Sequence, residues 1–515
     1  MALKDILGKG SLFSPFQSLL VSILSAPLLL VATHNLMQIF TAAVPPHHCQ
    51  SNLTWDQLRS QKDSCNRYIS LLSNATEPCK PGDWKYDLST YTSTIINKWD
   101  LVCEREWMKE LAQSIYMAGV LSGAMVYGSL ADRFGRRIVI LCCLLQTALM
   151  GTGAAFAPSF SLYCFFRFMA GMGICGFIIN DLGLTMEWTP IRYRATVSVF
   201  QSTCLTFGQL ILGGVAYVIN DWHWLQLALS VPYFFFFILA CWVPESFRWL
   251  VLAKHSRQAL CNLNRVARIN GDKDGSPVTL EMLKLETPND SSALTSRMTP
   301  IDLFRTPAMR KITIFLSMTW FSSSFCFFAL AMDVQKFGLS IYLVQVIFGS
   351  VELPFRVLST VLAAYIGRRF AVSGCLILAG VLILCSLAVP EDLIIMQISL
   401  IVLAKGLFGS SIVCSYLYTP ELYPTVLRQT GMGFTNMMMR LGAVVAPLVL
   451  MTKTYAPFFL LVILEQCSIV CGLQFYCYQK LSNCPLLDTV DEVETRGKNA
   501  TRKNLDTESV YGTKL

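Results

Sequence analysis

Three basic side chains lie inside the apolar runs of the second half of this 515-residue chain, at Arg356, Lys405 and Arg440. A charge at the centre of a lipid bilayer costs roughly 2.5–3.5 kcal/mol on insertion scales, so each of these residues implies a task or a partner. Arginine holds a carboxylate or sulfate through two parallel hydrogen bonds, and excess positive charge around a cavity favours anions. The alternative is structural, because Glu352 or Asp333 could pair with one of the three.

Further candidates for the wall of such a pocket lie in other apolar runs. Polar residues at membrane depth usually face the bundle interior, so Asn35 is predicted either to line a cavity or to bond to neighbouring helices. Aromatic residues gather in the second half at Trp320, Phe321, Phe325, Phe327, Phe328, Tyr416 and Tyr418. Most aromatic residues of a membrane bundle only pack, so we expect a minority of these rings to line the pocket.

The composition indicates a polytopic membrane protein. Hydrophobic residues make up 54% of the chain and charged residues 14%, with a mean hydropathy of +0.50, whereas soluble domains carry roughly 25% charged residues. The net charge of +8 collects in turns and in the central loop, which follows the positive-inside rule and gives no basic stripe for nucleic acid. No P-loop, Ser-His-Asp set or metal cluster stands out, so neither an enzyme nor a cofactor is expected.

The apolar runs predict an all-α membrane protein with twelve transmembrane helices in two six-helix repeats. The first half, 17–250, contains spans at about 17–40, 112–131, 138–157 and 160–184, and two more that end near Trp242. The second half, 309–480, contains spans that begin near Ile312, Tyr342, Phe370, Gln397, Thr430 and Phe458. The N-terminus 1–16, the central loop 251–308, with short helices, and a disordered tail 481–515 are assigned to the cytoplasm.

The long polar insertion 41–110 reads as an extracellular loop braced by disulfides. It contains Cys49, Cys65, Cys79 and Cys103, which allow three pairings that the sequence leaves open, and glycosylation sequons at Asn52 and Asn74. The run His47-His48-Cys49 lacks a second ligand pair at zinc spacing, so no metal site is predicted.

A polar turn of fixed spacing joins spans two and three and includes Gly128, Asp132, Arg133, Gly135, Arg136 and Arg137. Its glycines permit a reversal with positive φ, its arginines hold the turn in water, and Asp132 could pair with those arginines or face a neighbouring helix end. After span four, Glu187 with Arg192 and Arg194 could form an ion-pair latch. Both patterns recur in the second half, as Gly367-Arg368-Arg369 and as Glu421 with Arg428. The turn resembles the signature loop of the major facilitator superfamily of transporters.

Longer stretches resemble the organic anion transporter family, the anion branch of the polyspecific organic ion carriers. They are Met1–Leu7, the run His34–Cys49, Trp99–Cys103, Arg268–Gly271 and Leu417–Pro424. The resemblance implies that Arg356, Lys405 and Arg440 are cationic pocket residues, with Asn35, Trp320 and Phe328 on the pocket wall; cation-carrying relatives have an acid at the place of Arg440. The chain departs from the family at Cys477–Lys480, where a Pro-Glu-Thr turn is common. It also departs at Arg356, where some members have lysine, and at Leu205 and Ile412, where some have aromatic residues.

The function that these features predict is transport of amphipathic organic anions across the plasma membrane by alternating access. Carboxylates and sulfate conjugates are the expected substrates, with prostaglandins or steroid conjugates as bulky aliphatic examples. The resemblance implies exchange against an intracellular anion such as a dicarboxylate, although some members are facilitative. An organic cation or zwitterion carrier is the first alternative, and a surface sensor that binds without transport is the second.

Overall fold

The computed structural model describes residues 14–49, 65–70, 73–79, 82–88, 91–253, 255–270, 301–333, 340–424, 427–454 and 459–477. The chain divides into two compact units. The amino-terminal unit comprises Met1–Leu283 with Val334–Val346, and the carboxy-terminal unit comprises Lys284–Asp333 with Ile347–Leu515.

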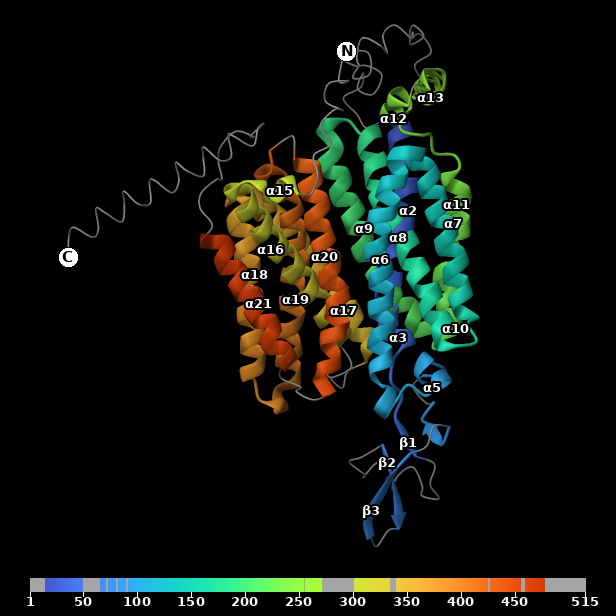
Figure 1. Ribbon diagram of the computed structural model, residues 1–515, viewed down its shortest axis with the longest axis vertical. Coiled ribbons are helices and arrows are strands. Elements are labelled where there is room, and N and C mark those ends of the chain that lie inside the picture. Colours follow the sequence, from blue (N-terminus) through green and yellow to red (C-terminus); the bar gives the residue numbers. More distant parts are fainter. Residues whose placement is uncertain are drawn as a thin grey trace, which may run out of the picture. The chain divides into compact units, whose positions relative to one another are not determined.

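The amino-terminal unit is a helical bundle with a small extension beyond one of its ends (Figure 1). Its long helices are α2 (Pro15–Leu36), α6 (Trp107–Phe134), α7 (Arg136–Ala155), α8 (Phe160–Trp188) and α9 (Arg194–Val218). The shorter ones are α3 (Gln38–Thr41), α5 (Ile95–Trp99), α10 (Trp222–Ser230), α11 (Pro232–Ala240), α12 (Phe247–Leu252) and α13 (Ser256–Ile269). The last two show that the start of the predicted central loop is helical.

Local sequence explains where several of these helices begin and how closely they pack. Ser14 caps α2 in a reciprocal capping box with Gln17, because each side chain accepts a hydrogen bond from the other residue's backbone N–H. Glycines let α6 and α8 touch: a β-carbon at Gly119 or Gly123 would overlap the backbone of α8. Small residues at a helix interface allow this close approach in membranes.

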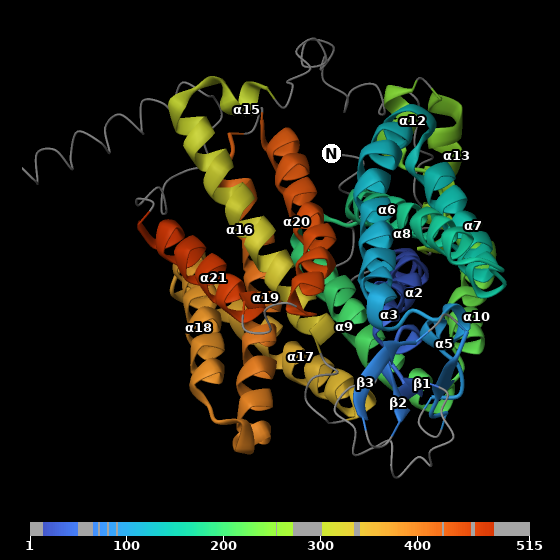
Figure 2. The ribbon, with the colours of Figure 1, turned by 60° about the horizontal axis from the view of Figure 1, so that its bottom comes forward.

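The carboxy-terminal unit is a second helical bundle (Figure 2). It contains α15 (Asp302–Arg305), α16 (Pro307–Met332), most of α17 (Ile341–Tyr365), α18 (Arg368–Ala388), α19 (Ile394–Leu422), α20 (Arg428–Leu450) and α21 (Phe459–Cys477). Helix α16 packs against α20, and α18 packs between α19 and α21. Gly442 permits the first contact, because a β-carbon there would lie 2.5 Å from the carbonyl oxygen of Phe321 on α16.

Eleven described segments are long and apolar enough to cross a membrane, and a shorter apolar helix, Leu461–Gln474 within α21, follows the last of them. The observed helices extend beyond the predicted spans. For example, α6 runs from Trp107 to Phe134, whereas the predicted span was 112–131. The residues 1–13, 271–300 and the tail after Cys477 lie outside the described residues.

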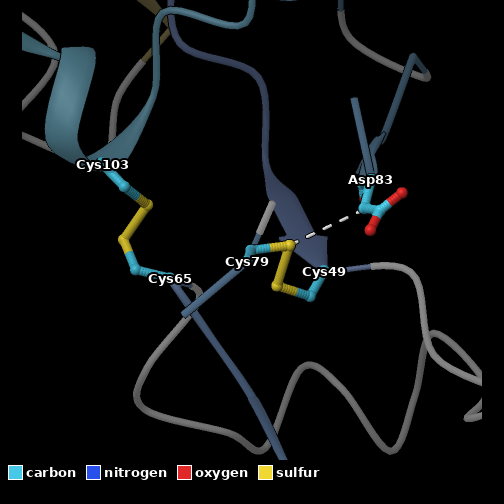
Figure 3. The surroundings of a disulfide bond; sticks show 5 residues. All are labelled: Cys49, Cys65, Cys79, Asp83 and Cys103. Atoms are coloured by element: carbon cyan, nitrogen blue, oxygen red, sulfur yellow. Dashed lines mark hydrogen bonds between the residues drawn. A yellow bond between two sulfur atoms is a disulfide. The ribbon is translucent and has the colours of Figure 1, made fainter. Parts of the chain in front are cut away.

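The insertion 41–110 contains strands, which the sequence pattern did not predict. Strand β1 (His47–Cys49) pairs antiparallel with β4 (Trp84–Tyr86), and β2 (Asn66–Ser70) pairs antiparallel with β3 (Ser73–Pro78). Of the three possible pairings, the structure has Cys49 joined to Cys79 and Cys65 joined to Cys103 (Figure 3). Asn74 lies in β3, and Asn52 lies outside the described residues.

The end of this insertion is fastened to the helices of the amino-terminal unit. The ammonium of Lys98 donates to the carbonyl oxygen of Ala157 at 3.0 Å and lies 5.0 Å and 4.9 Å from the ring centroids of Trp99 and Trp222. Its burial there lowers the pKa of the Lys98 ammonium. Around it, Ile95, Ile96, Leu101 and Val102 share one apolar cluster with Ala112, Ala154, Tyr163 and Trp222. The insertion and the helix ends therefore form one core.

Candidate functional site

The turn between α6 and α7 is a single residue. Gly135 has φ +94°, which only glycine adopts without strain, and a β-carbon there would meet the Glu245 carboxylate at 2.4 Å. Gly128, in contrast, lies within α6 and has open space around it. The prediction that both glycines form a reversal is therefore wrong for Gly128, because α6 continues for six residues beyond it, to Phe134.

Glu245 organises this turn, and sequence reasoning missed it. Its carboxylate accepts hydrogen bonds from the backbone N–H groups of Arg136 at 3.0 Å, Arg137 at 3.1 Å and Ser246 at 2.8 Å. The acid thus occupies the N-terminus of α7, where unpaired N–H groups and the helix dipole favour negative charge. Burial raises the pKa of the Glu245 carboxyl, and the three N–H donors oppose that rise.

The arginine partner of Glu187 is also different from the one expected. Arg136 lies 2.8 Å from the Glu187 carboxylate, and the Ser246 hydroxyl donates to the same carboxylate. Arg192 is exposed, and Arg194 donates from Nε to the Thr189 carbonyl at 3.2 Å. The latch predicted between Glu187 and the arginines at 192 and 194 is therefore replaced by a latch that joins α8 to α7.

Asp132 is peripheral to this latch. Its side chain is exposed and forms no ion pair with a described residue, while its backbone carbonyl accepts from the Trp249 indole at 3.0 Å. Arg133 lies over the Phe134 ring, and Arg137 donates to the Cys241 carbonyl at 2.7 Å. The possible pairing of Asp132 with these arginines is not what the structure contains.

The carboxy-terminal unit repeats the turn with the same chemistry. Gly367 has φ +103°, Arg368 follows it at the start of α18, and Arg368 forms an ion pair with Glu421 at the end of α19. Arg428 begins α20, and its buried Nε and one terminal nitrogen have no hydrogen-bond partner among the described residues. The predicted repeat of glycine, arginine and acid is thus present in both units.

One buried acid connects two of the three basic residues in the spans. Glu352 on α17 accepts from Arg356, one turn along the same helix, at 2.5 Å, and from the Lys405 ammonium on α19 at 3.1 Å. Glu352 and Lys405 are each 1% exposed, and the Arg356 side chain is 20% exposed. This arrangement is the structural alternative that the sequence left open, and it leaves one net positive charge on the triad.

Aromatic rings enclose the lysine of this triad. Its ammonium lies 4.4 Å from the Phe327 ring centroid and 4.7 Å from that of Phe348. Phe328 contacts Phe327 edge to face at 5.4 Å and is half-buried. Cation–π contacts of this kind strengthen when the cation is desolvated, so the rings help to stabilise Lys405 away from water.

Arg440 has a different environment. It lies on α20 and is 7% exposed. Among the described residues its Nε has no hydrogen-bond partner, and no acid forms an ion pair with it. One turn earlier, Asn436 donates to the Tyr416 hydroxyl at 3.2 Å. Trp320 meets Tyr416 edge to face at 4.5 Å and donates from its indole to Thr419 at 3.0 Å. Helices α16, α19 and α20 thus supply a cluster of aromatic and polar groups that includes Asn436, one turn from Arg440.

Asn35 belongs to the amino-terminal unit. Its side-chain oxygen accepts from the Tyr116 hydroxyl at 2.7 Å, and its backbone carbonyl accepts from Gln113 at 3.1 Å. Its side chain is half-buried. The hydrogen bond to a neighbouring helix, which was one of the two expectations for Asn35, is therefore present.

A possible metal group at His47, Cys65 and Cys103 has a simpler explanation. The three ligand atoms lie within 4.8 Å of one another, but Cys65 and Cys103 are joined as a disulfide. Disulfide sulfurs are not thiolates, which are the form of cysteine that binds metal.

Long apolar helices and two glycine turns, each with an arginine–acid pair, define a transporter of the major facilitator class. Residues 108–447 match the sequence model of the Major Facilitator Superfamily. A structure of the xylose transporter XylE from E. coli has the same fold, with a TM-score of 0.65 at 16% identity over 92% of this chain and 98% of that chain.

Relatives identify the family within this class. Solute carrier family 22 member 6 of Danio rerio is 42% identical over 532 residues, covering 96% of this chain and 95% of the relative. Organic anion transporter 3 of Homo sapiens is 43% identical over 511 residues, covering 96% of this chain and 94% of the relative. The chain belongs to solute carrier family 22 and is a multi-pass membrane carrier.

Proposed function

We propose that this carrier moves amphipathic organic anions across the plasma membrane by alternating access of its two six-helix halves. Relatives that cover nearly the whole chain are named organic anion transporters, which supports the substrate class. The observation that supports the proposal for this chain is that Arg440 is buried without an acidic partner among the described residues.

A guanidinium that is 7% exposed and lacks an acidic partner among the described residues is costly. The usual compensation is an ion pair, as the triad around Glu352 has. A bound carboxylate or sulfate supplies the missing negative charge, and it matches the planar fork of arginine with two parallel hydrogen bonds. The acidic group of the substrate is therefore proposed to form the ion pair that the Arg440 guanidinium otherwise lacks among the described residues.

The apolar body of the substrate is proposed to lie against the cluster of Trp320 and Tyr416, which contacts α20 at Asn436, one turn from Arg440. Trp320 and Tyr416 meet there edge to face, and Phe328 lies further along the same helix as Trp320. Sites for small molecules combine an apolar wall with a few placed polar groups. A prostaglandin or a steroid conjugate has both parts, an extended aliphatic body and one acidic group.

Arg356 is proposed as a second anion contact, and Lys405 as a support for it. Both cations share the Glu352 carboxylate, but only Arg356 has a partly exposed side chain. A substrate anion can approach this guanidinium, whereas Lys405 is enclosed by Phe327 and Phe348.

Asn35 is proposed as the residue of the amino-terminal unit that contacts the substrate. The counter-substrate is proposed to be an intracellular dicarboxylate.

Radiolabelled uptake in expressing cells tests the function. Anions, cations and prostaglandins are supplied outside, with and without a preloaded dicarboxylate inside. We expect saturable anion uptake that the preload accelerates. Cation uptake alone would support the cation alternative, and saturable surface binding without flux would support the sensor alternative.

The role of Arg440 is tested in the same assay with Arg440→Ala, Arg440→Lys and Arg440→Asp. A lost charged hydrogen bond typically costs about 1.5–3 kcal/mol, or roughly ten- to a hundred-fold in affinity. We expect alanine to abolish most anion uptake at unchanged surface level, lysine to recover part, and aspartate to recover none. The matched control is Arg310→Ala, an exposed arginine on α16. Anion uptake by Arg440→Asp at the wild-type rate and affinity would contradict the proposal.

A further inference from the structure

A second buried acid lies in a membrane span without a cation. Asp181 on α8 is 1% exposed, and its Oδ2 accepts from the Gln201 side-chain amide on α9 at 3.0 Å. The same amide nitrogen lies 3.4 Å from the Thr185 hydroxyl, one turn further along α8. Asp181 and Gln201 thus join two spans of the amino-terminal unit through a side-chain hydrogen bond.

The bond leaves two acceptors without a donor. Asp181 Oδ1 and Gln201 Oε1 are both buried, and neither has a hydrogen-bond partner among the described residues. No described basic residue forms an ion pair with Asp181. Two other acids of the described spans differ, because Glu187 pairs with Arg136 and Glu352 pairs with two cations.

Among the described residues on the helices around this part of α8, no basic side chain forms an ion pair with Asp181. From α6, the Tyr127 hydroxyl bonds to Gln146, and from α7, Arg136 is paired with Glu187 while Cys143 is a buried thiol. From α9, Cys204 is the titratable neighbour of Asp181. The other contacts at the far end of α8 are made by Gln17 of α2, which donates to the Trp188 carbonyl, and by Ser246, the cap of α12, which bonds to Glu187.

An ionised carboxylate in this place would be a buried charge with one neutral hydrogen bond, which costs several kcal/mol. A proton on Oδ1 removes the charge and converts this unpartnered acceptor into a hydrogen-bond donor. We propose that Asp181 is a proton-binding site, protonated in this conformation, and that release of the proton accompanies separation of α8 from α9. Protonatable carboxyls inside membrane spans commonly serve as proton relays in transporters.

The consequence for transport rests on the proposed function. If α8 and α9 separate during each cycle, Asp181 exchanges its proton with water during the cycle, and the uptake rate depends on pH through this residue. A single titrating group changes a rate by up to about tenfold per pH unit. The proton site itself does not depend on what the carrier transports.

Infrared spectroscopy of the purified full-length carrier tests the proton site directly. We expect a carbonyl stretching band of a protonated carboxyl at neutral pH, present in the wild type and in Asp392→Asn, and absent in Asp181→Asn. Asp392 is an exposed acid and serves as the matched control. A wild-type spectrum without a band that Asp181→Asn removes would overturn the proposal. If Asp181→Asn does not fold, Gln201→Met keeps the acid and removes its amide partner, so the band must shift; an unshifted band would overturn the assignment.

Uptake across a range of pH tests the coupling. Asp181→Asn carries a permanently neutral side chain of the same shape, so we expect transport with a flattened pH profile, while Asp392→Asn keeps the wild-type profile. An unchanged profile in Asp181→Asn would overturn the coupling. Absence of any anion uptake by the wild type, with the infrared band present, would instead refute the proposed substrate class and leave the proton site in place.

Discussion

Replacement of Glu352 by glutamine is expected to destabilise the carboxy-terminal unit strongly. The glutamine amide keeps the volume of the side chain but removes the carboxylate that lies 3.1 Å from the ammonium of Lys405, which is 1% exposed. Loss of one partner from a buried ion pair typically costs about 3–5 kcal/mol, because the remaining charge stays buried. Whole domains have a stability of about 5–15 kcal/mol, so a large fraction is lost.

A second replacement separates this explanation from a simple packing defect. Glu352→Gln with Lys405→Met removes both charges of the fully buried pair and keeps a linear side chain between the Phe327 and Phe348 rings. Neutral pairs of similar volume often match a buried ion pair in stability, so we expect this double variant to recover most of the loss. Glu352→Gln with Arg356→Gln is the matched control, and we expect little recovery, because the buried charge of Lys405 still lacks the Glu352 carboxylate.

Thermal unfolding of the purified carriers in detergent, followed by size-exclusion chromatography, measures this cycle. Equal stability of Glu352→Gln and the wild type, or equal recovery by the two double variants, would refute the reasoning. Anion uptake by the methionine double variant then reports on Lys405 itself. Uptake close to the wild-type rate is expected if Lys405 does not itself contact the substrate.

Three other predictions concern the turns and the insertion. Glu187→Gln removes the ion pair with Arg136 and should lower the maximal uptake rate at constant surface level, whereas Asp132→Ala should have a much smaller effect; the reverse order would contradict the assignment of the latch. Gly135→Ala should cost about 1–3 kcal/mol in thermal unfolding, since its φ of +94° strains any other residue, while Gly128→Ala in open helix should be neutral or slightly stabilising. Glycosidase should shift the wild-type band on a gel; no shift, or a shift that persists after Asn52→Gln with Asn74→Gln, would count against an extracellular insertion glycosylated at these two sites.

The sequence predicted those features that depend on local pattern. Apolar runs predicted the long helices, and the Gly-Arg-Arg spacing predicted the turns at Gly135 and Gly367. Glu352 and Arg356 lie four residues apart, so their pairing could be anticipated on a helix.

The features that the sequence did not predict depend on contacts between distant segments. Glu245 lies 109 residues from Arg136, and nothing in its own turn marks it as the cap of α7. The choice of Arg136 for Glu187, instead of nearer arginines in the sequence, follows from the packing of α7 against α8. The strands of the insertion are short and are fixed by the two disulfides, whose pairing the four cysteines left open.

Because the insertion is attached to the amino-terminal helices, a label on the insertion can report the movement of these helices. Because Ile95, Ile96 and Leu101 share a core with Ala154 and Tyr163, a fluorophore or antibody fragment on the insertion must follow the amino-terminal helices as they rotate. The disulfide from Cys65 to Cys103, four residues before α6, adds a covalent tether to the same helices. A label placed there would report the movement of one half of the carrier, and it would serve as a fiducial for orienting single particles.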